Sequence, residues 1–171
     1  MKNLLFLCGP NGIGKTTISK EIVRLLSNTA YVDSDPCRLM NPFVLSNETI
    51  PTIAKNISDL ITNYMNCPVI NNVVFSYGFH GRRKEVFDLV MKNLSEIDYS
   101  FIPLLLWCSE DENIKRMNTD NRSVDRIERT LNESRKAFNE IKYPKIDISD
   151  FSVSEAARNI IIRAGLEFNP I

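Results

Sequence analysis

The sequence has no excess of charge of either sign, because 21 lysine and arginine residues are balanced by 21 aspartate and glutamate residues. A chain without net charge has no general attraction for nucleic acid and no strongly basic face for a membrane surface. No apolar stretch approaches the roughly 18 residues that a membrane-spanning helix requires. We therefore expect a soluble protein with a small-molecule substrate, and a nucleic-acid partner is the less favoured alternative.

The cysteines lack the spacing of a metal site or of a disulfide framework. They stand at positions 8, 37, 67 and 108, and no two of them form a C-x-x-C pair. Widely spaced thiols of this kind are typical of the reducing cytosol. The apolar run at 4–8 is too short for a signal peptide, and the segment Gly-Pro-Asn-Gly at 9–12 interrupts it. The sequence thus indicates a cytoplasmic protein.

Short apolar runs alternate with longer segments that have the period of a helix. The apolar runs predict strands at 4–8, 30–32, 69–75, 101–107 and 145–148. The helical period predicts helices at 15–27, 49–65, 86–94 and 156–164, with a charged helical stretch after residue 108. This alternation over 171 residues, of which 43% are hydrophobic, predicts a single α/β domain, residues 1–171. Its parallel sheet should carry helices on both faces and bind ligands at the carboxyl ends of the strands.

The first predicted strand leads into a glycine-rich phosphate-binding motif. Residues 9–16, Gly-Pro-Asn-Gly-Ile-Gly-Lys-Thr, match G-x-x-x-x-G-K-[ST] at every fixed position, between an apolar strand and an amphipathic helix. In such a loop the backbone N–H groups cradle phosphate oxygens, Lys15 reaches the β- and γ-phosphates, and the Thr16 hydroxyl holds Mg²⁺. The predicted nucleotide-binding residues are Gly9, Asn11, Gly12, Ile13, Gly14, Lys15, Thr16 and Thr17.

Two other motifs of nucleotide-binding proteins are missing. A GTPase needs an Asn-Lys-x-Asp guanine signature, and the chain has none. Motor and transport ATPases usually carry an acidic residue at the end of an apolar strand, whereas the run at 73–75 leads into Ser-Tyr-Gly. These absences weaken the case for a switch or a motor.

An acidic pair, Asp33 and Asp35, follows the second predicted strand. The two residues stand eighteen and twenty positions after Lys15. At a strand end across from the phosphate loop, one carboxylate can assist Mg²⁺ and the other can accept the proton of the phosphate acceptor. The alternative is that both acids cap the turn into the next segment.

The phosphate loop followed by Asp33-x-Asp35 resembles the small-molecule kinases of the shikimate kinase, gluconate kinase and chloramphenicol phosphotransferase type. Asp35-Pro36-Cys37-Arg38 is similar to the D-x-x-R element of polynucleotide kinases. The resemblance implies a three-layer P-loop NTPase fold with a five-stranded parallel sheet of order 2-3-1-4-5. It also implies that Asp35 is the general base, that Arg38 binds the substrate and that Asp33 lies on the Mg²⁺ side. Which of the two acids is the base and which assists Mg²⁺ is left open.

The charged stretch after the fourth predicted strand contains several arginines, which are Arg116, Arg122, Arg126, Arg129 and Arg135. In kinases of this type, a mobile segment here closes over ATP and its arginines offset the charge of the transferring phosphoryl group. We expect such a lid near 112–128, with Arg122 and Arg126 on the nucleotide. The alternative is a solvated helix face on which Asp125 and Glu128 pair with the arginines.

The segment 76–83 follows the third predicted strand and combines aromatic residues, the single histidine and two arginines. We expect His80 and Arg82 to join Asp35 and Arg38 in binding the acceptor. The alternatives are a structural histidine and arginines that only begin the next helix.

Together these motifs predict a kinase that uses ATP and Mg²⁺ to phosphorylate a hydroxyl or phosphate of a small molecule. Lys15, Asp33, Asp35 and Arg122 are the predicted catalytic residues, and Thr16 and Asp33 are the predicted metal ligands. Two alternatives stay open: a 5′-hydroxyl polynucleotide or nucleoside kinase, and a nucleotide-binding regulator with little turnover.

Overall fold

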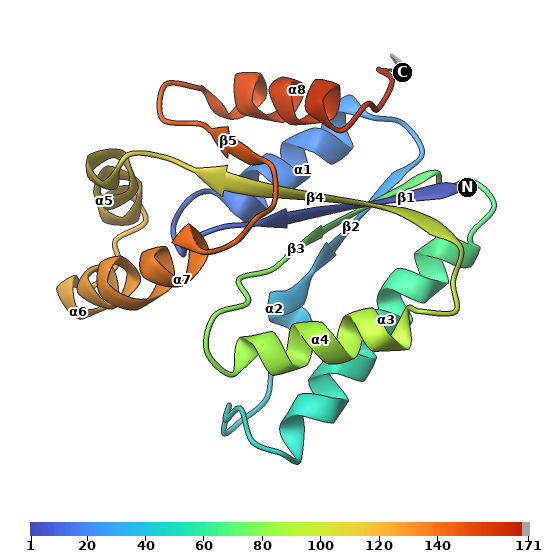
Figure 1. Cartoon of the computed structure of the whole chain (residues 1–171), viewed down its shortest axis with the longest axis horizontal. Helices are drawn as coiled ribbons and strands as arrows, with labels where there is room; N and C mark the ends of the chain where they lie inside the picture. Colours follow the sequence, from blue (N-terminus) through green and yellow to red (C-terminus); the bar gives the residue numbers. More distant parts are fainter. Residues whose placement is uncertain (169–171) are drawn as a thin grey trace.

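The computed structural model describes residues 1–168, and a parallel sheet of five strands runs through the middle of this part (Figure 1). The strands are β1 (Lys2–Cys8), β2 (Thr29–Asp33), β3 (Asn72–Ser76), β4 (Tyr99–Trp107) and β5 (Lys145–Asp147). Their spatial order is β2-β3-β1-β4-β5, and every neighbouring pair is parallel. The predicted fold class and strand order are therefore confirmed.

Helices cover both faces of this sheet, which makes three layers (Figure 1). The long helices are α1 (Lys15–Leu25), α3 (Thr49–Asn66), α4 (Arg83–Asn93), α5 (Glu110–Thr119) and α8 (Val153–Arg163). The short ones are α2 (Ser34–Cys37), α6 (Val124–Arg129), the π-helical turn η1 (Thr130–Ser134) and α7 (Arg135–Asn139). Within residues 1–168, no helix is both long and apolar enough to cross a membrane.

Strand β1 is the centre of the hydrophobic core. Leu4 and Phe6 face the layer of α3 and α4, whereas Leu5 and Leu7 face α1 and α8, and all four side chains are fully buried. A strand that is buried on both faces reads as a continuous apolar run, which is why the sequence identified it. Because this strand is packed on both faces, its carboxyl end is held firmly in place, and the glycine-rich loop starts from it.

The third strand begins later than the sequence predicts, at Asn72 rather than at residue 69. The N–H of Ile70 donates to the carbonyl of Cys67 at 3.1 Å, which closes a turn, and Val69 is 66% exposed. The apolar residues of this turn, Val69 and Ile70, explain why the sequence pattern placed the start of the strand too early. At its other end β3 includes Ser76, one residue beyond the predicted limit.

The charged stretch after β4 is not one helix but a series of short pieces. Helix α5 ends at Thr119, and Asn121 then adopts a left-handed conformation with φ 53° that turns the chain. After α6, the Thr130 hydroxyl donates to the carbonyl of Arg126 at 2.9 Å at the start of the π-helical turn. Such competition by a side chain is a known disturbance of the regular helical ladder.

Candidate active site

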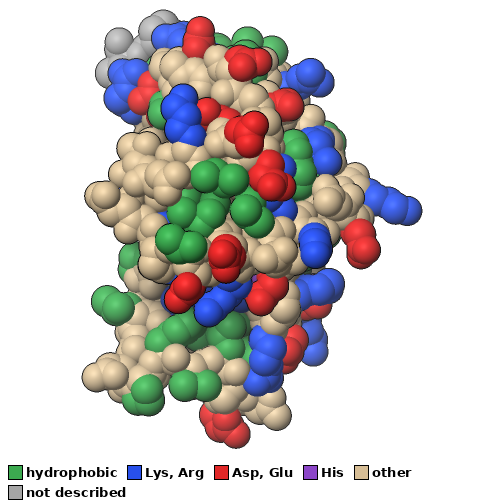
Figure 2. Space-filling model, turned by 90° about the vertical axis from the view of Figure 1, so that its left-hand side faces the viewer, with side chains coloured by type: hydrophobic (Ala, Val, Ile, Leu, Met, Phe, Trp, Pro, Cys, Tyr) green, Lys and Arg blue, Asp and Glu red, His purple; other side chains and the backbone are tan. Residues whose placement is uncertain are grey.

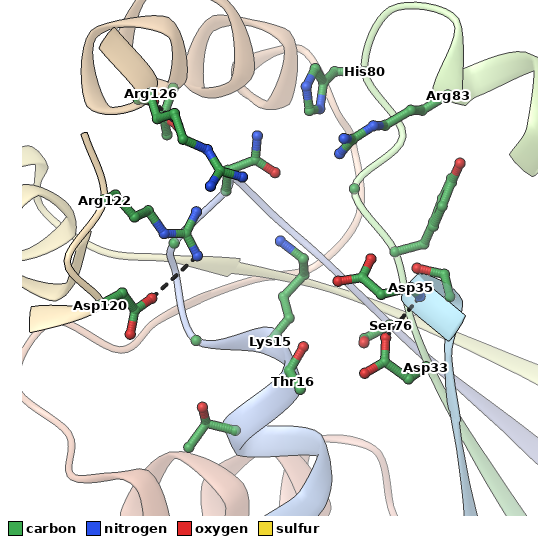
Figure 3. Close-up of a pocket in the computed structure, with 18 of the residues that line it drawn as sticks. Lys15, Thr16, Asp33, Asp35, Ser76, His80, Arg83, Asp120, Arg122 and Arg126 are labelled. Atoms are coloured by element: carbon green, nitrogen blue, oxygen red, sulfur yellow. Dashed lines mark hydrogen bonds and ion pairs between the residues drawn. The ribbon is translucent and has the colours of Figure 1, made fainter. Parts of the chain in front are cut away.

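A polar cleft of about 470 Å³ lies at the carboxyl ends of the strands (Figure 3). Its walls come from the glycine-rich loop and α1, the β2–α2 junction, the β3–α4 loop, and the segment from α5 to η1. The lining residues are Asn11, Gly12, Gly14, Lys15, Thr16, Thr17, Asp33, Ser34, Asp35, Arg38, Ser76, Tyr77, Gly78, His80, Arg83, Asp120, Arg122, Arg126, Arg129 and Thr130. Most of the predicted site residues thus meet in one place, although they come from distant parts of the sequence.

The glycine-rich loop joins β1 to α1 through backbone conformations that favour glycine. Gly12 and Gly14 have φ values of 73° and 100°, and Gly14 directly precedes the first residue of α1. At Gly9 a Cβ atom would lie only 2.5 Å from the carbonyl oxygen of Leu106. The loop can therefore pass close to β4 and present backbone N–H groups at the start of a helix, which is the arrangement that binds anions.

Lys15 lies at the centre of the cleft (Figure 3). Its Nζ donates to the carbonyl oxygens of Gly9 and Pro10, each at 2.8 Å. Burial lowers the pKa of Lys15 to about 8, and the nearby guanidinium groups of Arg83 and Arg122 act in the same direction. The ammonium group is charged at neutral pH but its charge is poorly compensated, so an incoming phosphate would stabilise it.

The loop is fastened to the segment that follows β4. The N–H of Asn11 donates to Ser134 Oγ at 3.1 Å, and the carbonyl of Asn11 accepts from Asn113 Nδ2 at 3.2 Å. Arg116 donates to the carbonyl of Ile13 at 3.0 Å. Of the predicted nucleotide-binding residues, Ile13 is fully buried, and neither Ile13 nor Gly9 lines the cleft. These two residues shape the loop from behind.

The acidic pair stands beside the end of β3. The β2–β3 register places Asp33 opposite Ser76, whose hydroxyl lies 2.8 Å from Tyr31 Oη. A hydroxyl therefore occupies the strand end where many nucleotide-binding proteins have an acid, and a carboxylate stands on the neighbouring strand instead. Asp33 also caps α2, because its Oδ1 accepts from the N–H of Asp35 at 3.0 Å. The capping alternative thus describes one contact of Asp33, while both acids line the cleft.

Asp35 and Arg38 form an ion pair on the short helix α2. Arg38 Nε donates to Asp35 Oδ1 at 3.1 Å, and Nη2 contacts the same oxygen. The Asp35 side chain is 68% exposed, whereas that of Arg38 is only 17% exposed. The carboxylate is thus open to the cleft and is oriented by a largely buried guanidinium group.

The arginines after β4 divide into two groups. Arg122 lies in the turn between α5 and α6 and pairs with Asp120 at 3.2 Å, while Arg126 and Arg129 project from α6, and all three line the cleft. The other two, Arg116 and Arg135, do not line this cleft. Arg116 bonds the carbonyls of Ile13 and Ile148 and the carboxylate of Glu112, and Arg135 bonds Cys108 and Asn113 and stacks on Trp107. Arg129 is a cleft residue that the sequence analysis did not select.

The β3–α4 loop contributes His80, as expected, but not Arg82. Arg82 donates to the Leu45 carbonyl at 2.8 Å and to Asn47 Oδ1 at 2.7 Å, and it pairs with Glu85, outside the cleft. Arg83 lines the cleft in its place. The helical period of α4 could have distinguished Arg83 from Arg82, because residue 83 precedes the buried Val86 and Phe87 by three and four positions and so shares their face of the helix. Arg82, which the sequence predicted as a substrate-binding residue, therefore lies outside the main cleft, and its neighbour Arg83 lies inside it.

A second, less polar cleft of about 330 Å³ adjoins the first and was not predicted. The two share Gly12, Gly14, Thr17 and Asp120. The second cleft continues between α5 and the start of α8, and Arg116 and Phe151 are among its lining residues. Its residues form no sequence motif, which explains why they were missed.

The charges of the main cleft fit a polyphosphate. Six cationic side chains line it, which are those of Lys15, Arg38, Arg83, Arg122, Arg126 and Arg129. Only three carboxylates oppose them, those of Asp33, Asp35 and Asp120. Guanidinium and ammonium groups gathered at a glycine-rich loop are suited to bind several phosphate oxygens at once. The hydroxyl oxygen of Thr16 and the carboxylate oxygens of Asp33 could coordinate a divalent cation beside the phosphate oxygens.

No family model matches the chain, and no curated protein matches it by sequence. Solved structures do match. The tunicamycin resistance protein of Deinococcus radiodurans superposes with a TM-score of 0.69 at 16% identity, over 99% of this chain and 100% of that one. A gluconokinase from Sinorhizobium meliloti 1021 gives a TM-score of 0.66 at 13% identity, over 95% and 91%. The APS kinase of Mycobacterium tuberculosis, solved in complex with AMPPNP and APS, gives 0.65 at 15% identity, over 94% and 96%.

These matches span nearly the whole chain. The chain therefore has the fold of the small P-loop kinases.

Proposed function

We propose that the protein is an ATP- and Mg²⁺-dependent phosphotransferase that moves the γ-phosphate to a hydroxyl or phosphate of a small molecule. One observation carries this proposal. Lys15, Asp35 and Arg122 come from three separate segments and line the same cleft. There they would supply a phosphate-binding cation, a base and a second cation. Phosphoryl transfer depends mainly on positioning and charge compensation, and it needs these components together.

The donor half of the site is formed by the glycine-rich loop and the second cleft. The phosphates would lie on the loop with Lys15. The nucleotide base would extend into the less polar cleft between Arg116 and Phe151. Arg116 is held there by the carbonyls of Ile13 and Ile148 at 3.0 and 2.8 Å, so it offers a fixed planar surface for a base.

Thr16 and Asp33 are the proposed holders of Mg²⁺, whose charge would compensate the phosphate oxygens. The register of β2 and β3 supports this assignment, because Asp33 stands next to Ser76 at the strand end where an acid is missing. The carboxylate of Asp33 and the hydroxyl groups of Thr16 and Ser76 then line the same part of the cleft (Figure 3).

Asp35 is the proposed general base. Its carboxylate is open to the cleft while Arg38 holds one of its oxygens, so the group keeps one orientation and can still reach an acceptor hydroxyl. Arg122 and Arg126 lie on the other side of Lys15, where they can offset the charge of the transferring group (Figure 3). A base on one side of Lys15 and arginines on the other favour an enzyme over a nucleotide-binding regulator, because a regulator needs no base.

The distribution of charge on one face of the molecule agrees with a small acceptor. On the face seen in Figure 2, lysine and arginine side chains alternate with aspartate and glutamate side chains, and no continuous basic stripe is visible. A long nucleic acid is usually bound by such a stripe. The arginines proposed for catalysis line the cleft instead.

A coupled assay of ADP release tests the proposal. The acceptors to compare are nucleosides, sugars, shikimate-like acids, aminoglycosides, phenicols and 5′-hydroxyl oligonucleotides. We expect acceptor-dependent ADP release with the wild-type protein and none with Lys15→Ala, whose melting curve should remain normal. Equal activity of the two proteins would refute the proposed donor site.

A further inference from the structure

The cleft has cationic side chains on two opposite sides. In Figure 3, Arg122 and Arg126 lie on one side of Lys15, while His80 and Arg83 lie on the other side, above Asp35. The first group belongs to the α5–α6 segment assigned to the nucleotide. The second group comes from the β3–α4 loop, which contains His80, and from the first residue of α4, Arg83. It faces the proposed base, so it belongs to the acceptor half.

Within the described residues, no ion pair and no side-chain hydrogen bond holds the guanidinium group of Arg83, although the charge of Asp35 acts on it from a longer distance. It is half-buried, and burial lowers its pKa, with the neighbouring Arg38 adding to the effect. The adjacent Arg82 differs, because it is exposed and paired with Glu85. A half-buried guanidinium group beside a second cation is an unfavourable arrangement that a bound anion would relieve.

Two neutral groups beside Arg83 also lack partners. Within residues 1–168, neither Tyr77 Oη nor His80 Nδ1 has a hydrogen-bond partner, although both atoms are buried. The Tyr77 side chain is only 3% exposed and lines the cleft. Burial raises the pKa of Tyr77 to about 12, so its hydroxyl keeps its proton, and burial lowers the pKa of His80 to about 4, so its ring is neutral near pH 7. A buried polar atom without a partner is costly unless a ligand satisfies it.

Gly78 marks the point where these groups converge. A Cβ atom at this position would lie 3.9 Å from Arg83 Nη1, 3.9 Å from His80 Nδ1 and 3.6 Å from Asn11 Oδ1. The absence of a side chain leaves room for a small group between the arginine and the histidine. An alanine would enter this space at ordinary contact distances, without a clash in the backbone.

We infer that the acceptor of the proposed reaction is itself an anion, and that its carboxylate or phosphate group binds to Arg83 and Arg38, with Tyr77 and His80 completing the hydrogen bonds. Arg38 shares this environment, because its charge and those of Arg83 and Asp35 all act on Tyr77. The hydroxyl to be phosphorylated then lies toward Asp35. A guanidinium group that makes no ion-pair contact of its own discriminates strongly for an anionic acceptor over an uncharged sugar, phenicol or nucleoside.

The test is a calorimetric titration of inorganic phosphate, and separately of malonate, into protein saturated with Mg²⁺ and AMPPNP. Filling the glycine-rich loop first removes it as a competing anion site. We expect one of the two anions to bind to a single site. Arg83→Gln and Gly78→Ala should weaken this binding about tenfold or more, whereas Arg82→Gln, the matched control one residue away, should leave it unchanged. The stronger of the two anions identifies the acceptor group as a phosphate or a carboxylate.

Three results would overturn the inference. In the first, the loaded wild-type protein binds neither anion. In the second, Arg83→Gln binds the anions as tightly as the wild type does. In the third, Arg83→Gln weakens the binding of AMPPNP itself, so that no separate anion site remains. The inference rests on the proposed function but can fail independently of it. If wild type and Lys15→Ala bind AMPPNP equally poorly, the donor site is wrong, and the same titration on nucleotide-free protein still compares Arg83→Gln with Arg82→Gln.

Discussion

The lowered pKa of Lys15 follows from its position, and it means that the side chain loses its charge at a lower pH than an ordinary lysine does. The ammonium group is surrounded by protein, with arginines nearby, and it rests on two loop carbonyls. A phosphate placed beside it would raise its pKa again, because opposite charges favour the ionised form. Nucleotide binding and protonation of Lys15 should therefore be coupled.

This coupling predicts that the affinity for AMPPNP falls as the pH rises above about 8, where Lys15 of the nucleotide-free protein loses its proton. The dissociation constant should be measured by calorimetry from about pH 7 to about pH 9, over which a lysine at its usual pKa stays charged. Lys15→Ala should bind more weakly and lack this pH dependence. A wild-type affinity that stays constant over the range contradicts the account.

His80 gives a second prediction, on stability. Its pKa in the folded protein is about 4, below its ordinary value of 6.5, because of burial and then the charges of Arg83, Lys15 and Arg38. Between these values the unfolded chain binds the extra proton, so stability should fall as the pH falls from about 6.5 to about 4. Thermal melts of wild type and His80→Gln should show the wild type losing more stability over this window. Parallel curves would mean that His80 is not held neutral.

Asp33 gives a third prediction. Asp33→Asn keeps a capping oxygen for α2 but removes a negative charge from the proposed metal side, so activity should require more Mg²⁺. Activity with an acceptor from the ADP-release assay should be titrated with Mg²⁺ for both proteins. A higher half-saturating Mg²⁺ concentration is expected for the variant. If Asp35→Asn shows this phenotype and Asp33→Asn instead loses turnover, the roles of the two acids are exchanged.

Single-residue assignments were predictable only where a motif fixes them. The loop residues follow from the spacing of glycine, lysine and threonine, and Asp33 and Asp35 follow from the end of a strand. The choice between Arg82 and Arg83 depended on the phase of α4, which begins at Arg83 itself. Tyr77 could not be identified as a cleft residue, because an aromatic residue after a buried strand packs into the core as readily as it lines a site.

At the scale of elements, the segment from α5 to η1 determines how the nucleotide would be covered. Its short pieces are joined by the turn at Asn121 and by the π-helical turn. Ser134 and Asn113 tie this segment to Asn11 of the phosphate-binding loop. The sequence predicted a charged helical lid here, but the π-helical turn within it is accompanied by a local bond from the Thr130 hydroxyl, which has no periodic signature.

This segment predicts a division between turnover and binding. Arg122→Ala should lower kcat by roughly 100-fold or more and change AMPPNP affinity much less, because a lid arginine acts on charge that develops in the transition state. Steady-state kinetics with an identified acceptor and calorimetry with AMPPNP separate the two effects. Arg129→Ala and Arg126→Ala are the comparisons on α6. If Arg126→Ala is the damaging change and Arg122→Ala is silent, the catalytic arginine was assigned to the wrong position.

At the scale of the whole molecule, the layers were predicted well, because each buried strand and amphipathic helix leaves its own period in the sequence. The strand order was implied by the resemblance to the small P-loop kinases, and the structure has that order. The parallel arrangement then places all carboxyl strand ends on one edge, which is why separate motifs could be expected to meet. The second cleft was beyond this reasoning. It is formed by α5 and the start of α8 through tertiary packing, and its residues share no motif.

Transfer of the γ-phosphate to an organic acceptor in this cleft can be followed directly with labelled ATP. ATP labelled in the γ-phosphate is incubated with Mg²⁺, the protein and a protein-free extract of cellular metabolites, and labelled products are separated from inorganic phosphate. The account predicts a labelled organic product with the wild type. Asp35→Asn should reduce it by roughly 100- to 10,000-fold while still binding AMPPNP, because asparagine keeps the shape of the side chain but cannot act as the base. A wild-type protein that binds ATP but yields only inorganic phosphate or no labelled product, or an Asp35→Asn variant that transfers phosphate at the wild-type rate, would contradict the account.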